Sequence, residues 1–163
     1  MCKIAIIGLG NVMLGDDGLG VHVVNFLRRK YGDKIPDNVT ILDVGTSIVN
    51  FIDDVKHYDY VIFIDAIDLG GKPGQHYSLE INVENKTSEN SHYSGMDLHS
   101  IGLNEALELL MTGDSRVKKV FVIGCQPSVI DLSLELSAEV KNCMEHVIDE
   151  VIKLIEKLKG KCV

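Results

Sequence analysis

The chain has 163 residues, 45% hydrophobic and 25% charged, a balance typical of a globular protein, and we expect residues 1–163 to form one domain. Its 24 acidic and 16 basic residues give a net charge of −8, which argues against nucleic acid or an anionic membrane surface as a partner.

The four cysteines, at positions 2, 125, 143 and 162, form no C-x-x-C pair, and we expect them to be free thiols in a reducing cytosol. No stretch resembles a signal peptide, and no apolar run approaches the length of a membrane span. We therefore expect a cytoplasmic protein. The sequence does not determine the oligomeric state, for which a monomer is the simplest expectation.

The first half of the chain alternates short apolar runs with helical periodicity. Residues 3–8 are predicted to form a buried strand, and a glycine-rich loop follows up to Gly18. Residues 17–29 have the spacing of a helix with one apolar face. Three further elements are predicted: a strand at 39–44, a short helix at 47–55, and a nearly all-apolar strand at 60–67.

The second half continues this alternation. A turn at 70–74 precedes an alternating, half-exposed edge strand at 76–81, and residues 83–96 are polar without periodicity. A helix at 97–111, a strand at 119–124 and a long helix at 137–159 complete the prediction. The pattern indicates an α/β fold of three layers, in which helices flank both faces of a mostly parallel, twisted five-stranded sheet. Ligands in such folds bind at the carboxyl ends of the strands.

The loop after the first strand is the first candidate site. Gly8 and Gly10 begin a dinucleotide-binding G-x-G-x-x-G pattern, but Met13 stands where its third glycine belongs, so NAD binding is not favoured. The loop ends in two adjacent carboxylates, Asp16 and Asp17. Either could cap the following helix, and either could face the crevice at the strand ends.

Asp65 and His99 are the other candidates. A carboxylate at the end of an apolar strand needs a partner or a metal, unless it emerges into the crevice, and a salt-bridged strand end is the alternative for Asp65. His99 lies near a helix start, where the helix dipole keeps imidazole neutral and able to bind a metal. A surface position is the alternative for His99, and no second feature supports the remaining histidines.

The chain contains no H-E-x-x-H and no G-x-S-x-G motif, and no spacing supports a thiol pair of Cys125 and His99. Residue types and spacing alone therefore indicate an α/β domain with two carboxylates and a histidine available for a metal.

A set of motifs in chain order resembles the hydrogenase maturation proteases. The motifs are G-L-G-N at residues 8–11, L-G-D-D-G-L-G-V at 14–21, D-x-G-T at 43–46, I-D-A at 64–66, H-S-I-G-L at 99–103, V-I-G-C-Q-P at 122–127 and L-E-L-S at 134–137. Each motif alone is weak, whereas the ordered set is specific and covers nearly the whole chain.

The resemblance implies an endopeptidase that removes the C-terminal extension of a nickel-loaded hydrogenase large-subunit precursor. It places the metal-binding and catalytic positions at Asp17, Asp65 and His99, with Asp16 as the alternative to Asp17. The nickel is supplied by the precursor, and no other cofactor is implied. Some family members carry Glu where this chain has Asp17.

Two other classes remain open. The same three side chains would suit a non-enzymatic nickel-binding or chaperone module for hydrogenase assembly. A nucleotide- or phosphate-using α/β enzyme is disfavoured by the incomplete glycine motif and by the absence of a P-loop. The polar segment 83–96 is predicted to help receive the precursor's tail, with a loop of no functional consequence as the alternative.

Overall fold

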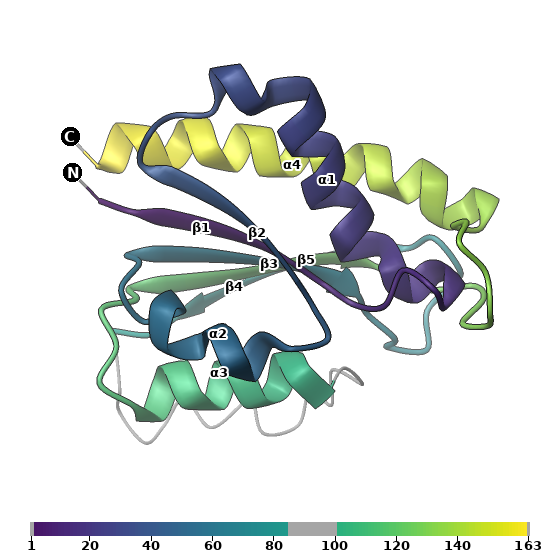
Figure 1. Ribbon diagram of the computed structural model, residues 1–163, viewed down its shortest axis with the longest axis horizontal. Helices are drawn as coiled ribbons and strands as arrows, with labels where there is room; N and C mark the ends of the chain where they lie inside the picture. The colour runs from purple at the N-terminus through teal and green to yellow at the C-terminus, as the bar shows by residue number, and fades with distance from the viewer. Residues whose placement is uncertain (1, 85–100, 163) are drawn as a thin grey trace.

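The computed structural model describes residues 2–84 and 101–162 and has a five-stranded sheet at its centre (Figure 1). The strand order is β2-β1-β3-β5-β4. The strands are β1 (Ile4–Leu9), β2 (Val39–Gly45), β3 (Tyr60–Ala66), β4 (His76–Asn82) and β5 (Lys119–Cys125). Only the pairing of β4 with β5 is antiparallel among these five strands, so the predicted, mostly parallel sheet is confirmed.

Helices cover both faces of the sheet, as the alternating pattern predicted (Figure 1). One face carries α1 (Leu19–Tyr31) and α4 (Ala138–Lys161), and the other carries α2 (Ile48–Val55) and α3 (Ile101–Thr112). Short 3-10 turns lie at Gly15–Gly18 and Gly32–Lys34. No helix in the described parts of the chain combines the length and the apolar content that crossing a bilayer requires.

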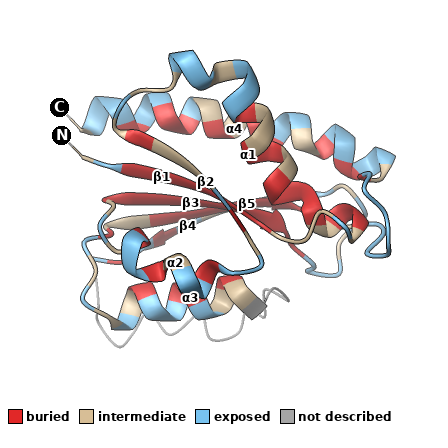
Figure 2. Ribbon diagram, viewed as in Figure 1, coloured by how far each residue is buried: buried red, intermediate tan, exposed pale blue. Residues whose placement is uncertain are grey.

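The core consists of two apolar layers, one on each side of the sheet (Figure 2). All residues of β1 and β3 are buried because helices cover both of their faces. The predicted apolar face of α1, formed by Leu19, Val23, Val24 and Leu27, is buried against this sheet. In β4 exposed positions alternate with half-buried or buried ones along the whole strand, which fits its place at the sheet edge.

The helix predicted from residue 17 begins two residues later. Residues 15–18 form a 3-10 turn instead, and two of their amides are bonded to the segment before α4. The amide of Gly15 donates to the carbonyl of Ser133 (2.8 Å), and that of Asp16 donates to the carbonyl of Val129 (3.0 Å). The periodicity of the sequence cannot predict hydrogen bonds to partners this distant in the chain.

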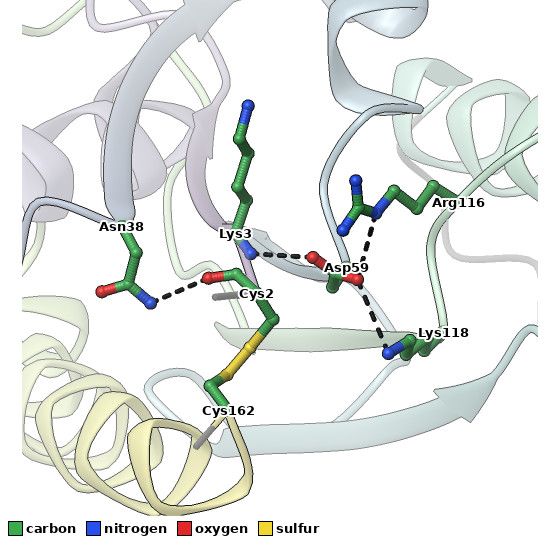
Figure 3. The surroundings of a disulfide bond; sticks show 7 residues. All are labelled: Cys2, Lys3, Asn38, Asp59, Arg116, Lys118 and Cys162. Atoms are coloured by element: carbon green, nitrogen blue, oxygen red, sulfur yellow. Dashed lines mark hydrogen bonds and ion pairs between the residues drawn. A yellow bond between two sulfur atoms is a disulfide. The ribbon is translucent and has the colours of Figure 1, made fainter.

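The expectation of free thiols is wrong, because all four cysteines are paired: Cys2 with Cys162, and Cys125 with Cys143. The first disulfide joins the start of the chain to the end of α4, where the two termini lie close together (Figures 1 and 3). The second ties the carboxyl end of β5 to α4. Pairings across 160 and 18 positions follow from tertiary placement and not from cysteine spacing.

A buried carboxylate, Asp59, organises the edge of the sheet beside the first disulfide (Figure 3). It accepts hydrogen bonds from the amide of Lys3 (2.8 Å) and from Nε of Arg116 (3.2 Å), and Nζ of Lys118 lies 3.6 Å away. Burial raises the pKa of Asp59, but the hydrogen bonds from the Lys3 amide and Arg116 outweigh this effect, and the pKa lies below its ordinary value. This network lies at the amino ends of the strands, opposite the candidate site, and connects the start of β1 to the segment that leads into β5.

Candidate functional site

A pocket of about 380 Å³ opens at the carboxyl ends of the strands, where ligands bind in folds of this class. Four segments form it: the loop after β1, the turn between β2 and α2, the end of β3 and the start of α3. Its lining residues are Leu9, Gly10, Asp17, Gly45, Thr46, Ile48, Val49, Asp65, Gly102, Leu103 and Glu105.

Two of the three predicted site residues, Asp17 and Asp65, line this pocket together. Asp65 is the last residue but one of β3, is only 2% exposed and lies beside Gly124 of β5 in the sheet register. Asp17 belongs to the 3-10 turn and is half-buried, and its carboxylate accepts a hydrogen bond from the amide of Asn11 (2.9 Å). The fold therefore brings together carboxylates that are 48 positions apart.

The loop after β1 folds back so that Gly10 lies against the backbone of Asp17, and this explains the glycine. The φ angle of Gly10 is +113°, which disfavours residues with a side chain. A Cβ at this position would lie 1.8 Å from the Asp17 carbonyl oxygen and 3.6 Å from Oδ1 of Asp65. The two glycines that suggested a dinucleotide motif thus serve close packing of backbone: Gly10 lies against the backbone of Asp17, and Gly8 lies against Gly20 of α1.

Asp16 has a different role from its neighbour. It is fully buried, and its carboxylate accepts hydrogen bonds from the amides of Ser128 (2.8 Å), Val129 (2.8 Å) and Ser137 (2.7 Å), and from the hydroxyl of Ser137 (2.9 Å). Burial raises the pKa of Asp16, but these amides lower it below its ordinary value. Asp16 therefore anchors the segment that leads into α4, and Asp17 is the carboxylate of this pair that the pocket receives.

The third predicted residue, His99, lies outside the described residues, as does most of the polar segment 83–96. The described chain resumes at Ile101, and Gly102, Leu103 and Glu105 of α3 line the pocket. Within residues 2–84 and 101–162, no three His, Cys, Asp or Glu side chains are grouped so that they could hold a metal ion. The roles of His99 and of segment 83–96 remain predictions.

The pocket contains a third carboxylate, Glu105, that the sequence did not single out. Its position on α3 has no motif around it, and only the packing of α3 brings it to the pocket. A thiol nucleophile is excluded at Cys125, which is buried and bonded to Cys143. Among the described residues that line the pocket, the carboxylate oxygens of Asp17, Asp65 and Glu105 can bind metal ions and accept protons.

Gln126 positions the chain that leaves β3 beyond Asp65. Its side-chain oxygen accepts hydrogen bonds from the amides of Leu69 (2.9 Å) and Gly71 (3.1 Å) and from the hydroxyl of Tyr77 (2.9 Å). Its amide nitrogen donates to Asp68 (2.8 Å). A buried amide with this many partners fixes the loop beyond the strand end.

Comparison with known proteins gives a consistent result. The family model for hydrogenase maturation proteases matches residues 21–154. A putative hydrogenase maturation protease of Methanocaldococcus jannaschii is 32% identical over 162 residues, and the match covers 94% of this chain and 97% of the Methanocaldococcus protein. The chain spans 74% of the hydrogenase expression/formation protein HupD of Rhizobium leguminosarum, at 29% identity, and 62% of the HupD of Bradyrhizobium diazoefficiens, at 34% identity.

Solved structures agree with these sequence relatives. The hydrogenase maturating endopeptidase HybD of E. coli superposes with a TM-score of 0.78 at 28% identity, covering 95% of this chain and 93% of that one. A hydrogenase 2 maturation peptidase from a Thaumarchaeota archaeon superposes with a TM-score of 0.72 at 33% identity, covering 94% of this chain and 97% of that one.

Proposed function

Because the chain belongs to the hydrogenase maturation protease family, we propose that it is the endopeptidase that removes the C-terminal extension of a nickel-loaded hydrogenase large-subunit precursor. The observation that carries this proposal is the pairing of Asp17 and Asp65 in one pocket at the carboxyl edge of the sheet. The pocket lies at the strand ends, where ligands bind in folds of this class, and its lining includes Gly10, Gly45 and Gly102, which leave room for a peptide.

In this proposal Asp17, Asp65 and His99 contact the nickel that the precursor carries. Carboxylates and a neutral imidazole are suitable ligands for a divalent metal that substrate thiolates already hold. The position of Asp17 and Asp65 in one pocket supports their proposed role, whereas the proposed role of His99 rests on the sequence motif alone. The metal belongs to the substrate, so these contacts recognise a loaded precursor and fix the position of its tail.

The proposed reaction is amide hydrolysis. Water attacks the scissile carbonyl carbon, a pocket carboxylate accepts the proton that this water loses, and the C–N bond then breaks. The departing nitrogen takes up a proton and leaves as the amine of the released extension.

The deciding experiment incubates the protein with purified precursors of nickel–iron hydrogenases, each with and without nickel, and weighs the products by mass spectrometry. A large subunit shortened at its C-terminus, formed only from nickel-loaded precursor, is the expected result. A stable complex without shortening would indicate a chaperone instead. Trimming of nickel-free precursor at the same rate would remove nickel from the recognition step.

A further inference from the structure

Five exposed apolar side chains gather beside the candidate site. Met13 belongs to the loop after β1, and Val129, Ile130, Leu132 and Leu134 belong to the segment before α4; we call these five side chains the apolar loop patch. The two segments lie next to each other at one end of the molecule (Figure 1). Leu132 and Leu134 are 79% and 70% exposed. Single exposed apolar residues are ordinary, but a group of them marks a surface for binding.

Hydrogen bonds hold the two segments of this patch as one unit. The amide of Ser133 donates to the carbonyl of Met13 (3.0 Å), and the carbonyl of Ser133 accepts from the amide of Gly15 (2.8 Å). The buried carboxylate of Asp16 adds bonds from Ser128, Val129 and Ser137. The backbone that carries these side chains is therefore held in place, and a preorganised backbone loses little conformational freedom on binding.

The patch is continuous with the pocket along the chain. Gly10 and Asp17 line the pocket, and Met13 of the patch lies between them in the same loop. A protein whose tail occupies the pocket is thus brought against the patch by the same eight-residue stretch, residues 10–17. A second copy of this chain would have no reason to bind beside the pocket in particular.

We propose that the apolar loop patch is the docking surface for the folded body of the hydrogenase large-subunit precursor whose tail enters the pocket. This inference rests on the proposed function. A pocket of about 380 Å³ holds only a short peptide segment, whereas specific protein complexes bury roughly 800 Å² on each partner. Most of the contact with a folded substrate must therefore lie outside the pocket.

The composition of the surface fits this occupant. An apolar centre with a polar rim is the usual anatomy of a protein interface, and the exposed Ser128, Asp131 and Glu135 provide the rim. Two of these rim residues are acidic, and the whole chain carries a net charge of −8. The complementary face of the precursor is therefore apolar at its centre with basic residues around it.

The test replaces Leu132 and Leu134 together by glutamine and compares this variant with Leu109→Gln, an equally conservative change at an exposed leucine on α3 away from the patch. Binding of nickel-loaded precursor is measured by interferometry with an Asp65→Asn background, so that no cleavage intervenes. We expect Kd to rise at least about tenfold for the double variant and to change less than twofold for Leu109→Gln. In the active background, KM should rise similarly while kcat is retained.

The outcomes separate this inference from the proposed function. An unchanged Kd in the double variant, with normal trimming by the wild type, overturns the docking surface and leaves the function intact. Binding that depends on the patch, without trimming by the wild type, overturns the function and keeps the docking surface. A dimer that the double variant converts to a monomer, with an unchanged Kd for precursor, assigns the patch to a second copy and overturns the proposal.

Discussion

Asp16 and Asp17 are neighbours in the chain, yet their carboxylates face different surroundings. Asp16 is fully buried and accepts four hydrogen bonds from the segment before α4, whereas Asp17 lines the pocket and accepts one from the amide of Asn11. Asp16 thus fixes the loop to the segment before α4, and its neighbour Asp17 is thereby held at the pocket.

The first prediction follows from this division of roles. Asp17→Asn should keep the free energy of unfolding within about 1 kcal/mol, because the amide oxygen can still accept from Asn11. We expect its trimming rate to fall at least about 100-fold, since the carboxylate charge is lost from the pocket. Asp16→Asn should instead destabilise the fold by about 3 kcal/mol, because amide hydrogens would then face buried donors.

Urea unfolding and the precursor-trimming assay check both halves of this prediction. Ser137→Ala is a milder companion to Asp16→Asn, since it removes one donor to Asp16 and the side-chain cap of α4, for a cost of about 1 kcal/mol. A stable and fully active Asp17→Asn enzyme would exclude Asp17 from the site.

Sequence reasoning located the pocket because its main signals are local. Asp65 ends an apolar strand, and parallel strands in an α/β fold place such residues at one edge. Asp17 could not be separated from Asp16 in the same way, since the partners of Asp16 are 112 to 121 positions away. Glu105 was missed for a similar reason: only the packing of α3 brings it to the pocket. His99 stays a prediction.

The second prediction concerns pH. The pKa values of Asp16 and Asp59 are below the ordinary value in the folded protein, so the unfolded chain binds protons more readily. Their contribution to stability is complete above the unfolded pKa of about 4 and is lost as the pH falls through the lower, folded values.

We therefore expect the free energy of unfolding to drop steeply below about pH 4, and to drop less in Asp16→Asn and Asp59→Asn. Urea titrations between pH 7 and pH 2 measure these slopes. A wild-type slope equal to that of both variants would show that neither carboxylate takes up a proton when the chain unfolds, and would contradict the lowered pKa values.

The third prediction tests the close approach of Gly10 to the backbone of Asp17. Gly10→Ala should destabilise the protein by more than about 1 kcal/mol and reduce trimming sharply, because φ is +113° and the new Cβ would meet the Asp17 carbonyl oxygen. Gly160→Ala in α4 is the matched control. No atom outside its own helix turn lies within 4 Å of its new Cβ, and alanine favours the helix by up to about 1 kcal/mol.

Thermal unfolding and the trimming assay separate these two alanine variants. We expect a lower Tm with weak activity for Gly10→Ala, and an equal or higher Tm with full activity for Gly160→Ala. An active Gly10→Ala enzyme of normal stability would mean that the loop does not approach Asp17 this closely.

The fourth prediction concerns the two disulfides. Cys2–Cys162 spans 160 positions and Cys125–Cys143 spans 18, so the chain-entropy argument gives the first bond the larger effect on the unfolded state. We expect Cys2→Ala with Cys162→Ala to lower the free energy of unfolding by about 5 kcal/mol, and Cys125→Ala with Cys143→Ala to lower it by about 3 kcal/mol. Trimming should persist in the first variant, because that bond lies at the termini and away from the pocket. A thiol titration of the denatured, non-reduced protein provides the direct check: we expect no reactive thiol, and four would restore the free cysteines that the sequence suggested.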